Sequence, residues 1–399
     1  MSFDIALSGI QAINEQLETV SNNIANAATY GFKAGRANFA SVMAGSKANG
    51  VEIGSVTQNI SQNGSMTTTG RGLDAAIDGR GFFVSVNGQG ITQYSRVGIF
   101  STDAKGFLVD SNNNRVQGYG PSKNGSLGAM GDVKVPTGQI PAVATTGIDY
   151  VGNLSADWDN KPAASFDSTK SDTFNMVKQS IVYDTLGTQH TLSQYFAKQD
   201  ADNINVYYSL DGAAASATPG TTPAVLTFDS TGQLTATTGN SINIPAAGGA
   251  AAGNVTIDYK GTTRFAGEAN TTTNRSDGYA SGTFVGVEMA ADGSLVAKYS
   301  NDQSQVVGTI ALATFANEGA LSSISETSWV ANADSGAALY AAPGVGLAGK
   351  LSTGTLEGSN VDVTSELVGL MTSQRNYQAN SKVMTTENQM MQALMQALP

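Results

Sequence analysis

Few side chains in this sequence are of a kind that carries out chemistry. The chain of 399 residues contains no cysteine and a single histidine, His190. It therefore has no thiolate nucleophile, no disulfide and no zinc site that uses cysteine ligands. A Ser-His-Asp arrangement would have to use His190 as its base. His190 follows an expected turn at residues 184–187, and we interpret it as a solvated strand residue.

The most suggestive motif for a cofactor is GVGLAGK at residues 344–350. It contains GxGxxG and comes close to the phosphate-binding pattern GxxxxGK. That pattern requires Ser or Thr after the lysine, where Leu351 stands. The dinucleotide-binding pattern requires a helix after the glycines, and the sequence LSTGTLEGSN that follows is not helical. We therefore expect a flexible glycine loop and no cofactor.

Acidic residues form one pattern that is similar to a metal site. Asp110, Asn112 and Asn114 have the alternate spacing of a calcium-binding loop. However, Arg115 replaces the required glycine, and Pro121 stands where the bidentate glutamate should be. A hairpin turn explains the pattern more simply. A hydrolase built on a β fold would need a pair of carboxylates, and the sequence singles out no such pair. We therefore predict that the protein is not an enzyme.

Composition excludes further classes of function. Lys and Arg total 21 and Asp and Glu total 32, which gives a formal net charge of −11 and a pI near 4.5. This balance argues against binding to nucleic acid or to an anionic membrane. There is no apolar stretch of about 18 residues that could span a bilayer. The first residues, MSFDIALSGIQAINEQ, lack the features of a cleavable signal peptide.

Both ends of the chain have the alternating three- and four-residue spacing of apolar positions that is typical of coiled-coil helices. The first such region starts at Phe3, and we expect it to stop near Gly31. The second follows Asp362, which can cap it, and has Glu366 in its first turn. The apolar residues that we expect to form the assembly interface are Ile10, Ile13, Leu17, Val20, Ile24, Leu367, Leu370, Tyr377, Met384 and Met391.

Neither helix can bury its seam alone. The two helices could pair and fold back onto the core of the chain, or their seams could pack against other subunits. Polar residues at seam positions Gln374, Ser381 and Asn388 favour assembly between subunits, because such residues fix register and partner. Short exposed helices of this kind are marginal in water. We therefore expect both helices to be disordered in the isolated chain and to fold on assembly.

Between the helices the sequence predicts strands almost throughout. Phe82, Val84 and Val86 alternate with polar residues and lead into Asn87-Gly88, a strong hairpin signal. Residues 146–285 form a separate β unit inserted between two halves of another. The predicted fold is a mainly β multidomain protein with α-helical coiled-coil termini. Its domains are nested and discontinuous, with the terminal helices paired at one end and two β domains outward.

Five short motifs occur in order along the chain: SNNIAN at residues 21–26, TYGFK at 29–33, TGRGLD at 69–74, LEGSNVD at 356–362 and QRNYQAN at 374–380. Together these motifs resemble one known family, the bacterial flagellar rod and hook proteins. The total length and the large insertion are similar to those of hook subunits rather than of the shorter rod subunits. A distal rod subunit is the alternative within the family. A secreted β-rich adhesin or carbohydrate-binding protein is the alternative from another class.

The resemblance implies a subunit that polymerises into a curved tube and acts as a universal joint between rod and filament. The implied partners are other copies of the chain, the distal rod protein, the hook cap scaffold, the hook-filament junction protein and the flagellar type III export apparatus. The implied location is extracellular, reached without a cleaved signal peptide. The implied domains are 1–30 with 360–399 (helices), 31–70 (extended connector), 71–145 with 286–359 (middle β domain) and 146–285 (outer β domain).

Overall fold

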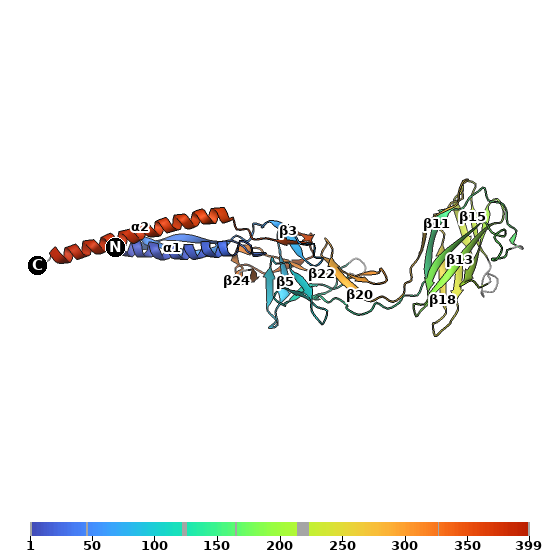
Figure 1. Ribbon diagram of the computed structural model, residues 1–399, viewed down its shortest axis with the longest axis horizontal. Helices are drawn as coiled ribbons and strands as arrows, with labels where there is room; N and C mark the ends of the chain where they lie inside the picture. The colour runs from blue at the N-terminus through green and yellow to red at the C-terminus, as the bar shows by residue number, and fades with distance from the viewer. Residues whose placement is uncertain are drawn as a thin grey trace. The chain divides into compact units, whose positions relative to one another are not determined.

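The structure is a computed structural model that describes residues 2–44, 47–121, 126–163, 166–213, 223–325 and 327–397. The chain forms two compact units. The first comprises Met1–Thr137, Val285–Lys298 and Ser304–Pro399, and the second comprises Gly138–Phe284 and Tyr299–Gln303. Most of the regular structure is β, with one long helix toward each end of the chain and the two helices packed together (Figure 1). The predicted fold class is therefore confirmed.

The two helices are α1 (Ser2–Ala25) and α2 (Val363–Ala397), of 24 and 35 residues. Asp362 caps α2 as predicted, because its carboxylate accepts the Thr364 N–H at 3.0 Å and the Ser365 hydroxyl at 2.7 Å. These hydrogen bonds, led by the one from the Ser365 hydroxyl, hold the pKa of Asp362 below its usual value. As far as the described residues go, neither helix has the length and apolar character that crossing a bilayer requires.

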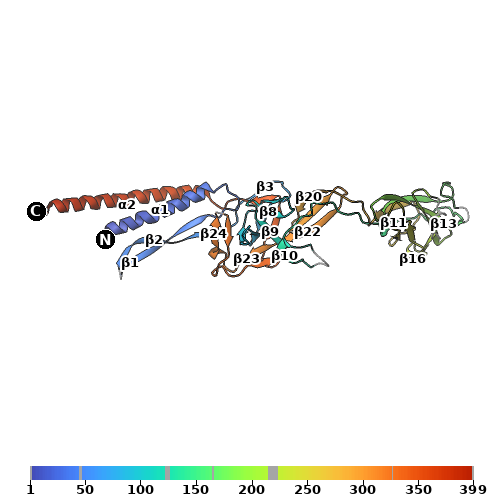
Figure 2. The same ribbon diagram turned by 90° about the horizontal axis from the view of Figure 1, so that it is seen from below.

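Residues 31–70, expected to be an extended connector, contain a long antiparallel hairpin. Its strands are β1 (Gly35–Ala44) and β2 (Lys47–Gln58). Two irregularities in the register, at Asn38/Phe39 and at Ser41/Met43, bend the hairpin. It contacts α1 along its length, as Figure 2 shows. The hairpin and both helices thus form the helical end of the first unit, a name that we keep below.

The rest of the first unit is built on a thirteen-stranded sheet. Eight strands follow in sheet order: β20 (Phe284–Met289), β21 (Ser294–Tyr299), β22 (Ser304–Ile310), β9 (Arg115–Tyr119), β5 (Phe82–Val86), β6 (Thr92–Ser95), β25 (Ser328–Val330) and β24 (Ser322–Ser325). Off this path are β7 (Phe100–Thr102), β8 (Leu108–Asp110), β10 (Met130–Asp132), β23 (Leu312–Thr314) and β26 (Leu339–Ala341). The predicted hairpin at Asn87-Gly88 is confirmed as the connection between β5 and β6. Phe82, Phe315 and Trp329 pack edge to face in the core.

Two small antiparallel pairs join early and late parts of the chain in this unit. One pairs β4 (Ala75–Asp78) with β27 (Lys350–Thr353), and the other pairs β3 (Met66–Thr68) with β28 (Thr355–Glu357). Because β28 ends shortly before α2 begins, these pairs hold the chain in place where it enters the second helix.

The second unit is a sandwich of two sheets. One sheet has the order β12 (Met176–Tyr183), β13 (Gln189–Lys198), β14 (Asn203–Leu210), β15 (Ala224–Phe228) and β16 (Leu234–Thr238). The other has the order β17 (Ser241–Ile244), β18 (Gly253–Asp258), β11 (Gly147–Asn153) and β19 (Asn270–Ser276). Side chains from both sheets, among them Tyr150, Phe196 and Tyr259, form one buried apolar core. The unit therefore closes its own core.

Candidate assembly interface

The single histidine is held between two carboxylates. On β13, Nδ1 of His190 lies 2.6 Å from Oδ2 of Asp211, and Nε2 lies 3.6 Å from Oδ2 of Asp184. The hydrogen bond with Asp211, together with the nearby Asp184, raises the pKa of the imidazole. Because a carboxylate faces each ring nitrogen, His190 is not placed to take a proton from a hydroxyl nucleophile. Sequence analysis treated this residue as solvated, and the structure instead shows a paired side chain.

The calcium-like pattern is a hairpin turn. Oδ1 of Asp110 accepts the backbone N–H groups of Asn112 and Asn114, each at 2.9 Å, so the carboxylate is used to hold the turn. Among the residues that the structure describes, no group of three or more His, Cys, Asp or Glu side chains could hold a metal ion.

The GVGLAG segment is a closed loop of two turns rather than a cofactor cradle. The N–H of Gly344 donates to the carbonyl of Gly349 at 2.8 Å, and the N–H of Gly349 donates to the carbonyl of Arg80 at 2.7 Å. Gly344 has φ 73°, a left-handed conformation that favours glycine. The strand β27 follows at Lys350, so the helix that a dinucleotide-binding motif requires is replaced by a strand.

The strongest functional feature is the packing of α1 against α2. The two helices run in opposite directions, because Gly9 meets Asn380 while Val20 meets Gly369. A Cβ placed on Gly9 would lie 2.9 Å from Nδ2 of Asn380. The absence of a side chain at Gly9 therefore lets the helices approach closely at this point. Small and polar residues, rather than an apolar seam, fill much of this contact.

All five residues predicted on α1 lie on its buried or half-buried side. Ile13 and Val20 are each 7% exposed. Ile10, Leu17 and Ile24 are half-buried. The apolar face of α1 is thus largely covered by α2 and by the hairpin of the same chain.

The five residues predicted on α2 are far less covered. Leu370 and Met384 are half-buried, while Leu367, Tyr377 and Met391 are exposed. The fully buried position on this helix is Ser373, a residue that the sequence pattern did not select. α2 therefore presents small and polar side chains to α1 and leaves much of its apolar surface free in the single chain.

Seven of the exposed apolar side chains of α2 gather in two patches. The first contains Leu367, Val368 and Met371, near the start of the helix. The second, which we call the distal patch, consists of Met390, Met391, Leu394 and Met395, with Met391 at 63% and Leu394 at 62% exposure. The distal patch borders a groove of about 570 Å³ that Phe3 of α1 also lines. Clustered apolar exposure of this kind is typical of surfaces that bind a partner.

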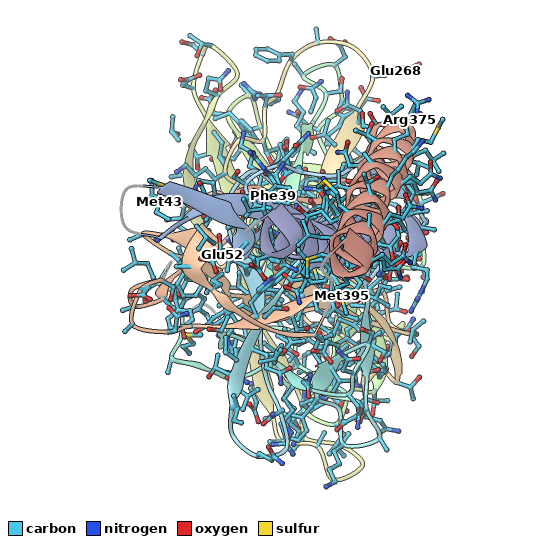
Figure 3. All side chains as sticks on the ribbon, turned by 90° about the vertical axis from the view of Figure 1, so that its left-hand side faces the viewer. Phe39, Met43, Glu52, Glu268, Arg375 and Met395 are labelled. Carbon is cyan, nitrogen blue, oxygen red and sulfur yellow. The ribbon has the colours of Figure 1, made fainter. Side chains whose placement is uncertain are left out.

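The hairpin adds apolar surface that the sequence analysis missed. Ser8 of α1 accepts the N–H of Val51 at 3.2 Å, which fixes one side of the hairpin on the helix. On the hairpin, Phe39, Met43 and Val56 are exposed. Figure 3 looks at the helical end and shows Phe39 and Met43 on the hairpin and Met395 on α2. No periodic signal in the sequence marks these hairpin residues as a group.

Asn23 joins the three elements of the helical end. Its Nδ2 donates to the carbonyl of Gly35 at 2.8 Å and to Oε1 of Glu366 at 2.9 Å, and its Oδ1 accepts the N–H of Gly35 at 2.8 Å. The side chain is 2% exposed, so these hydrogen bonds replace its contacts with water. Asn23 belongs to the SNNIAN motif, and the sequence alone does not indicate these contacts.

Comparison with known families is consistent along the chain. Four family models match: "Flagella basal body rod protein" over residues 3–33, "Flagellar hook protein FlgE/F/G D1 domain" over 76–156, "Flagellar basal body protein FlaE D2 domain" over 153–279 and "Flagellar basal body rod FlgEFG protein C-terminal" over 352–397. Each matches a part that the structure shows as helical end, sheet or sandwich.

Curated relatives match over nearly the full length. The flagellar hook protein FlgE of Salmonella typhimurium is 36% identical over 402 residues, and the alignment covers 99% of each chain. The Escherichia coli protein of the same name is 35% identical over 401 residues, again with 99% of each chain covered. A crystal structure of the Helicobacter pylori flagellar hook protein FlgE2 covers 73% of this chain and 100% of its own, with TM-score 0.54 and 14% identity. That structure shows a shared fold.

The four family models, which match the helical end, the sheet and the sandwich, define the class of this protein as a structural subunit of a flagellar assembly. The chain belongs to the bacterial flagellar hook protein family. Its role is that of a hook subunit.

Proposed function

We propose that this chain polymerises with copies of itself through the helical end, and that the resulting curved tube is the universal joint between rod and filament. The observation that carries the proposal is the exposure of the distal patch of α2 in a chain whose β units bury their own cores. Polymerisation would remove that surface from water and so provide the driving force.

The ten residues predicted as an assembly interface divide into two roles under this proposal. The five on α1 shape the helix pair within one subunit, because they are buried or half-buried there. Leu367, Tyr377 and Met391 on α2 contact neighbouring subunits, because they are exposed in the single chain. The hairpin residues Phe39 and Met43 are also exposed and provide a further contact surface.

Flexibility of the tube requires contacts that slide. Charged residues make up 13% of the chain, about half of the usual share. Short uncharged side chains on residues 146–285 allow many hydrogen bonds of similar energy, whereas buried ion pairs impose strong geometric preferences. New Lys–Glu pairs on this segment should therefore stiffen the hook, and a hook with such pairs that bends like the parent would contradict this part of the proposal.

The proposal extends to domains, location and partners. The domains are 1–30 with 360–399, 31–70, 71–145 with 286–359, and 146–285. The location is extracellular, after export by the flagellar type III apparatus without a cleaved signal peptide. The further partners are the distal rod protein, the hook cap scaffold and the hook-filament junction protein. The full-length similarity to flagellar hook proteins supports each of these assignments.

Immunogold electron microscopy on detached flagella tests the proposed function directly. An antibody against residues 146–285 should label a short curved segment between rod and filament. Label on the rod would instead assign the chain to the rod. Label over the cell envelope, with the flagella bare, would point to an adhesin. Preabsorption of the antibody with the purified chain is the control, because it should remove specific label.

A further inference from the structure

The first unit contains a fully buried cluster of charges where the helical end joins the sheet. Lys33 follows α1, Arg96 follows β6, and Glu357 is the last residue of β28. The side chains of Lys33 and Glu357 are 0% exposed and that of Arg96 is 1% exposed. Burial of ionised groups is costly unless partners replace the lost water.

Glu357 is the centre of this cluster. Its Oε1 accepts the Lys33 ammonium at 2.7 Å and the N–H of Gly64 at 3.0 Å. Its Oε2 lies 3.5 Å from Nη1 of Arg96. Lys33 also donates to the carbonyl of Gln62 at 2.6 Å. One carboxylate therefore binds three segments that are far apart in the sequence.

Further hydrogen bonds link the two segments that connect the helices to the sheet, one after α1 and one before α2. The N–H of Gly31, after α1, donates to the carbonyl of Glu357 at 2.8 Å. Asn360, three residues after Glu357, accepts the N–H of Ala34 at 2.7 Å and donates to the carbonyls of Asn59 and Gln62. The exit of α1, the end of the hairpin and the entry of α2 are thus fastened to one another.

Arg96 attaches the cluster to the aromatic core of the sheet. Its guanidinium lies 5.2 Å from the centre of the Phe82 ring. Phe82 in turn packs against Phe315 and Trp329. The cluster therefore touches the helical end on one side and the core of the sheet on the other.

The charges in the cluster do not balance. Lys33 and Arg96 are two cations, and Glu357 is the carboxylate that contacts both of them. Burial lowers the pKa of Lys33 and of Arg96, and the attraction of Glu357, with a further contribution from Glu318, opposes that shift. Loss of the Glu357 charge would remove the carboxylate that contacts both cations.

We propose that Glu357 is a positioning residue that fixes the helix pair in one orientation on the sheet, so that twist applied to one is passed to the other. The consequence for torque rests on the proposed function, because it concerns the assembled hook. An apolar cluster of the same volume would hold the parts together with less directional preference, whereas three hydrogen-bonded charges specify one arrangement.

Hydrogen exchange of the full-length chain tests the positioning role. Glu357→Gln keeps the shape of the side chain and removes its charge. We expect exchange at Gly31 and Gly64 and along the hairpin to accelerate on the order of a hundredfold, while the second unit is unchanged. Asp132→Asn, which removes the carboxylate partner of Arg115 on the same sheet, is the matched control and should leave these amides protected.

A double variant separates electrostatics from packing. Lys33→Met added to Glu357→Gln removes one of the two cations. If charge fixes the orientation, the double variant should be better protected than Glu357→Gln alone, by about tenfold. If Glu357 acts only by filling space, Glu357→Gln should exchange like the parent and the added Lys33→Met should not restore protection, and that result would overturn the proposal.

The twist of assembled hooks provides the functional readout. Hooks built from the Glu357→Gln chain should assemble and show a larger angular displacement per unit torque in a tethered-bead measurement. Wild-type torsional stiffness in such hooks would overturn the inference and leave the proposed function intact. If the variant fails to assemble, the exchange pattern of the monomer decides, since protected Gly31 and Gly64 amides would exclude the coupling role.

Discussion

The helical end and the β sandwich of the second unit differ in how much of their apolar surface they bury within one chain. The sandwich buries residues such as Tyr150, Phe196 and Tyr259 between its own two sheets. The helical end leaves large apolar side chains such as Met391 and Leu394 in water. One region therefore buries its apolar core within a single chain, whereas the other leaves apolar surface that we propose is covered by another subunit.

Under the proposed assembly, this contrast divides the subunit into an independently stable part and a part whose stability depends on concentration. Helices without tertiary partners are marginal in water. α2 packs against α1, yet the residues of its distal patch stay largely exposed beside Phe3. Substitutions in the helical end should consequently affect polymerisation, whereas substitutions in the sandwich should affect the unfolding of the second unit.

The largest effect is expected in the distal patch. Met391→Asp combined with Leu394→Asp places two charges on the surface proposed to be buried between subunits. The critical concentration for polymerisation should rise on the order of a hundredfold. Sedimentation of polymer against monomer measures this rise. The control is Gln378→Asp combined with Lys382→Asp, at two exposed polar residues of the same helix. An equal rise in the critical concentration there would refute a special role for the distal patch.

The next effect concerns the closed core of the second unit. Phe196→Ala removes a fully buried ring and should lower the free energy of unfolding of the sandwich by about 3–5 kcal/mol. Trp158 packs against that core, and Trp329 lies in the core of the first unit. In a Trp329→Phe background, the fluorescence of Trp158 therefore reports the unfolding of the second unit alone. The urea midpoint of Trp158 fluorescence should fall.

The Phe196→Ala variant also tests whether the sandwich contributes to polymerisation. The critical concentration for polymerisation, measured below the new midpoint, should stay within a few-fold of the parent. A large loss of polymerisation in a folded Phe196→Ala chain would show that the sandwich also drives assembly, contrary to the division drawn here.

A smaller effect is expected inside the helical end. Asn23→Ala removes hydrogen bonds to Gly35 and Glu366 and leaves their polar groups buried without that partner. The local free energy of opening of the hairpin should fall by about 1–3 kcal/mol. Limited proteolysis within β1 and β2 measures this change. Asn14→Ala, on the exposed face of the same helix, is the matched control and should be cleaved like the parent.

The smallest effect is the pH dependence of the second unit. Asp211 and Asp184 raise the pKa of His190, so the imidazolium stabilises the folded state. This contribution is complete below the unfolded pKa of about 6.5 and is lost as the pH rises through the higher folded pKa. The expected decline is under about 1 kcal/mol, because Asp211 is half exposed.

Urea unfolding of Trp158 fluorescence across this pH range measures the decline. His190→Gln should show a flat profile over the same interval. An equal decline in His190→Gln would assign the effect to other groups.

Much of the fold could be predicted from the sequence because its signals are local. The heptad spacing gave both helices, the acid at Asp362 gave the cap of α2, and Asn87-Gly88 gave a hairpin. The first helix ends at Ala25, several residues before the expected stop at Gly31. Residues 26–31 form turns instead, in which Asn26 and Thr29 hydrogen-bond locally.

Other features could not be predicted because they depend on distant residues. Lys33 and Glu357 are 324 positions apart, and no local sequence pattern indicates their contact. The heptad pattern of α2 selected an apolar seam, whereas Ser373 is the residue that is buried. Small residues allow the two backbones to approach, and this preference outweighs apolar spacing where the helices meet.

Hydrogen exchange of the monomer and of the assembled hook is the most direct test of the central claim, that the helical end completes itself by assembly while the β sandwich is already complete. We predict fast exchange in the monomer for the part of α2 that carries the distal patch, and strong protection of that segment in the hook. The core strands β13 and β14 should be equally protected in both states. Equal exchange of α2 before and after assembly would contradict the account.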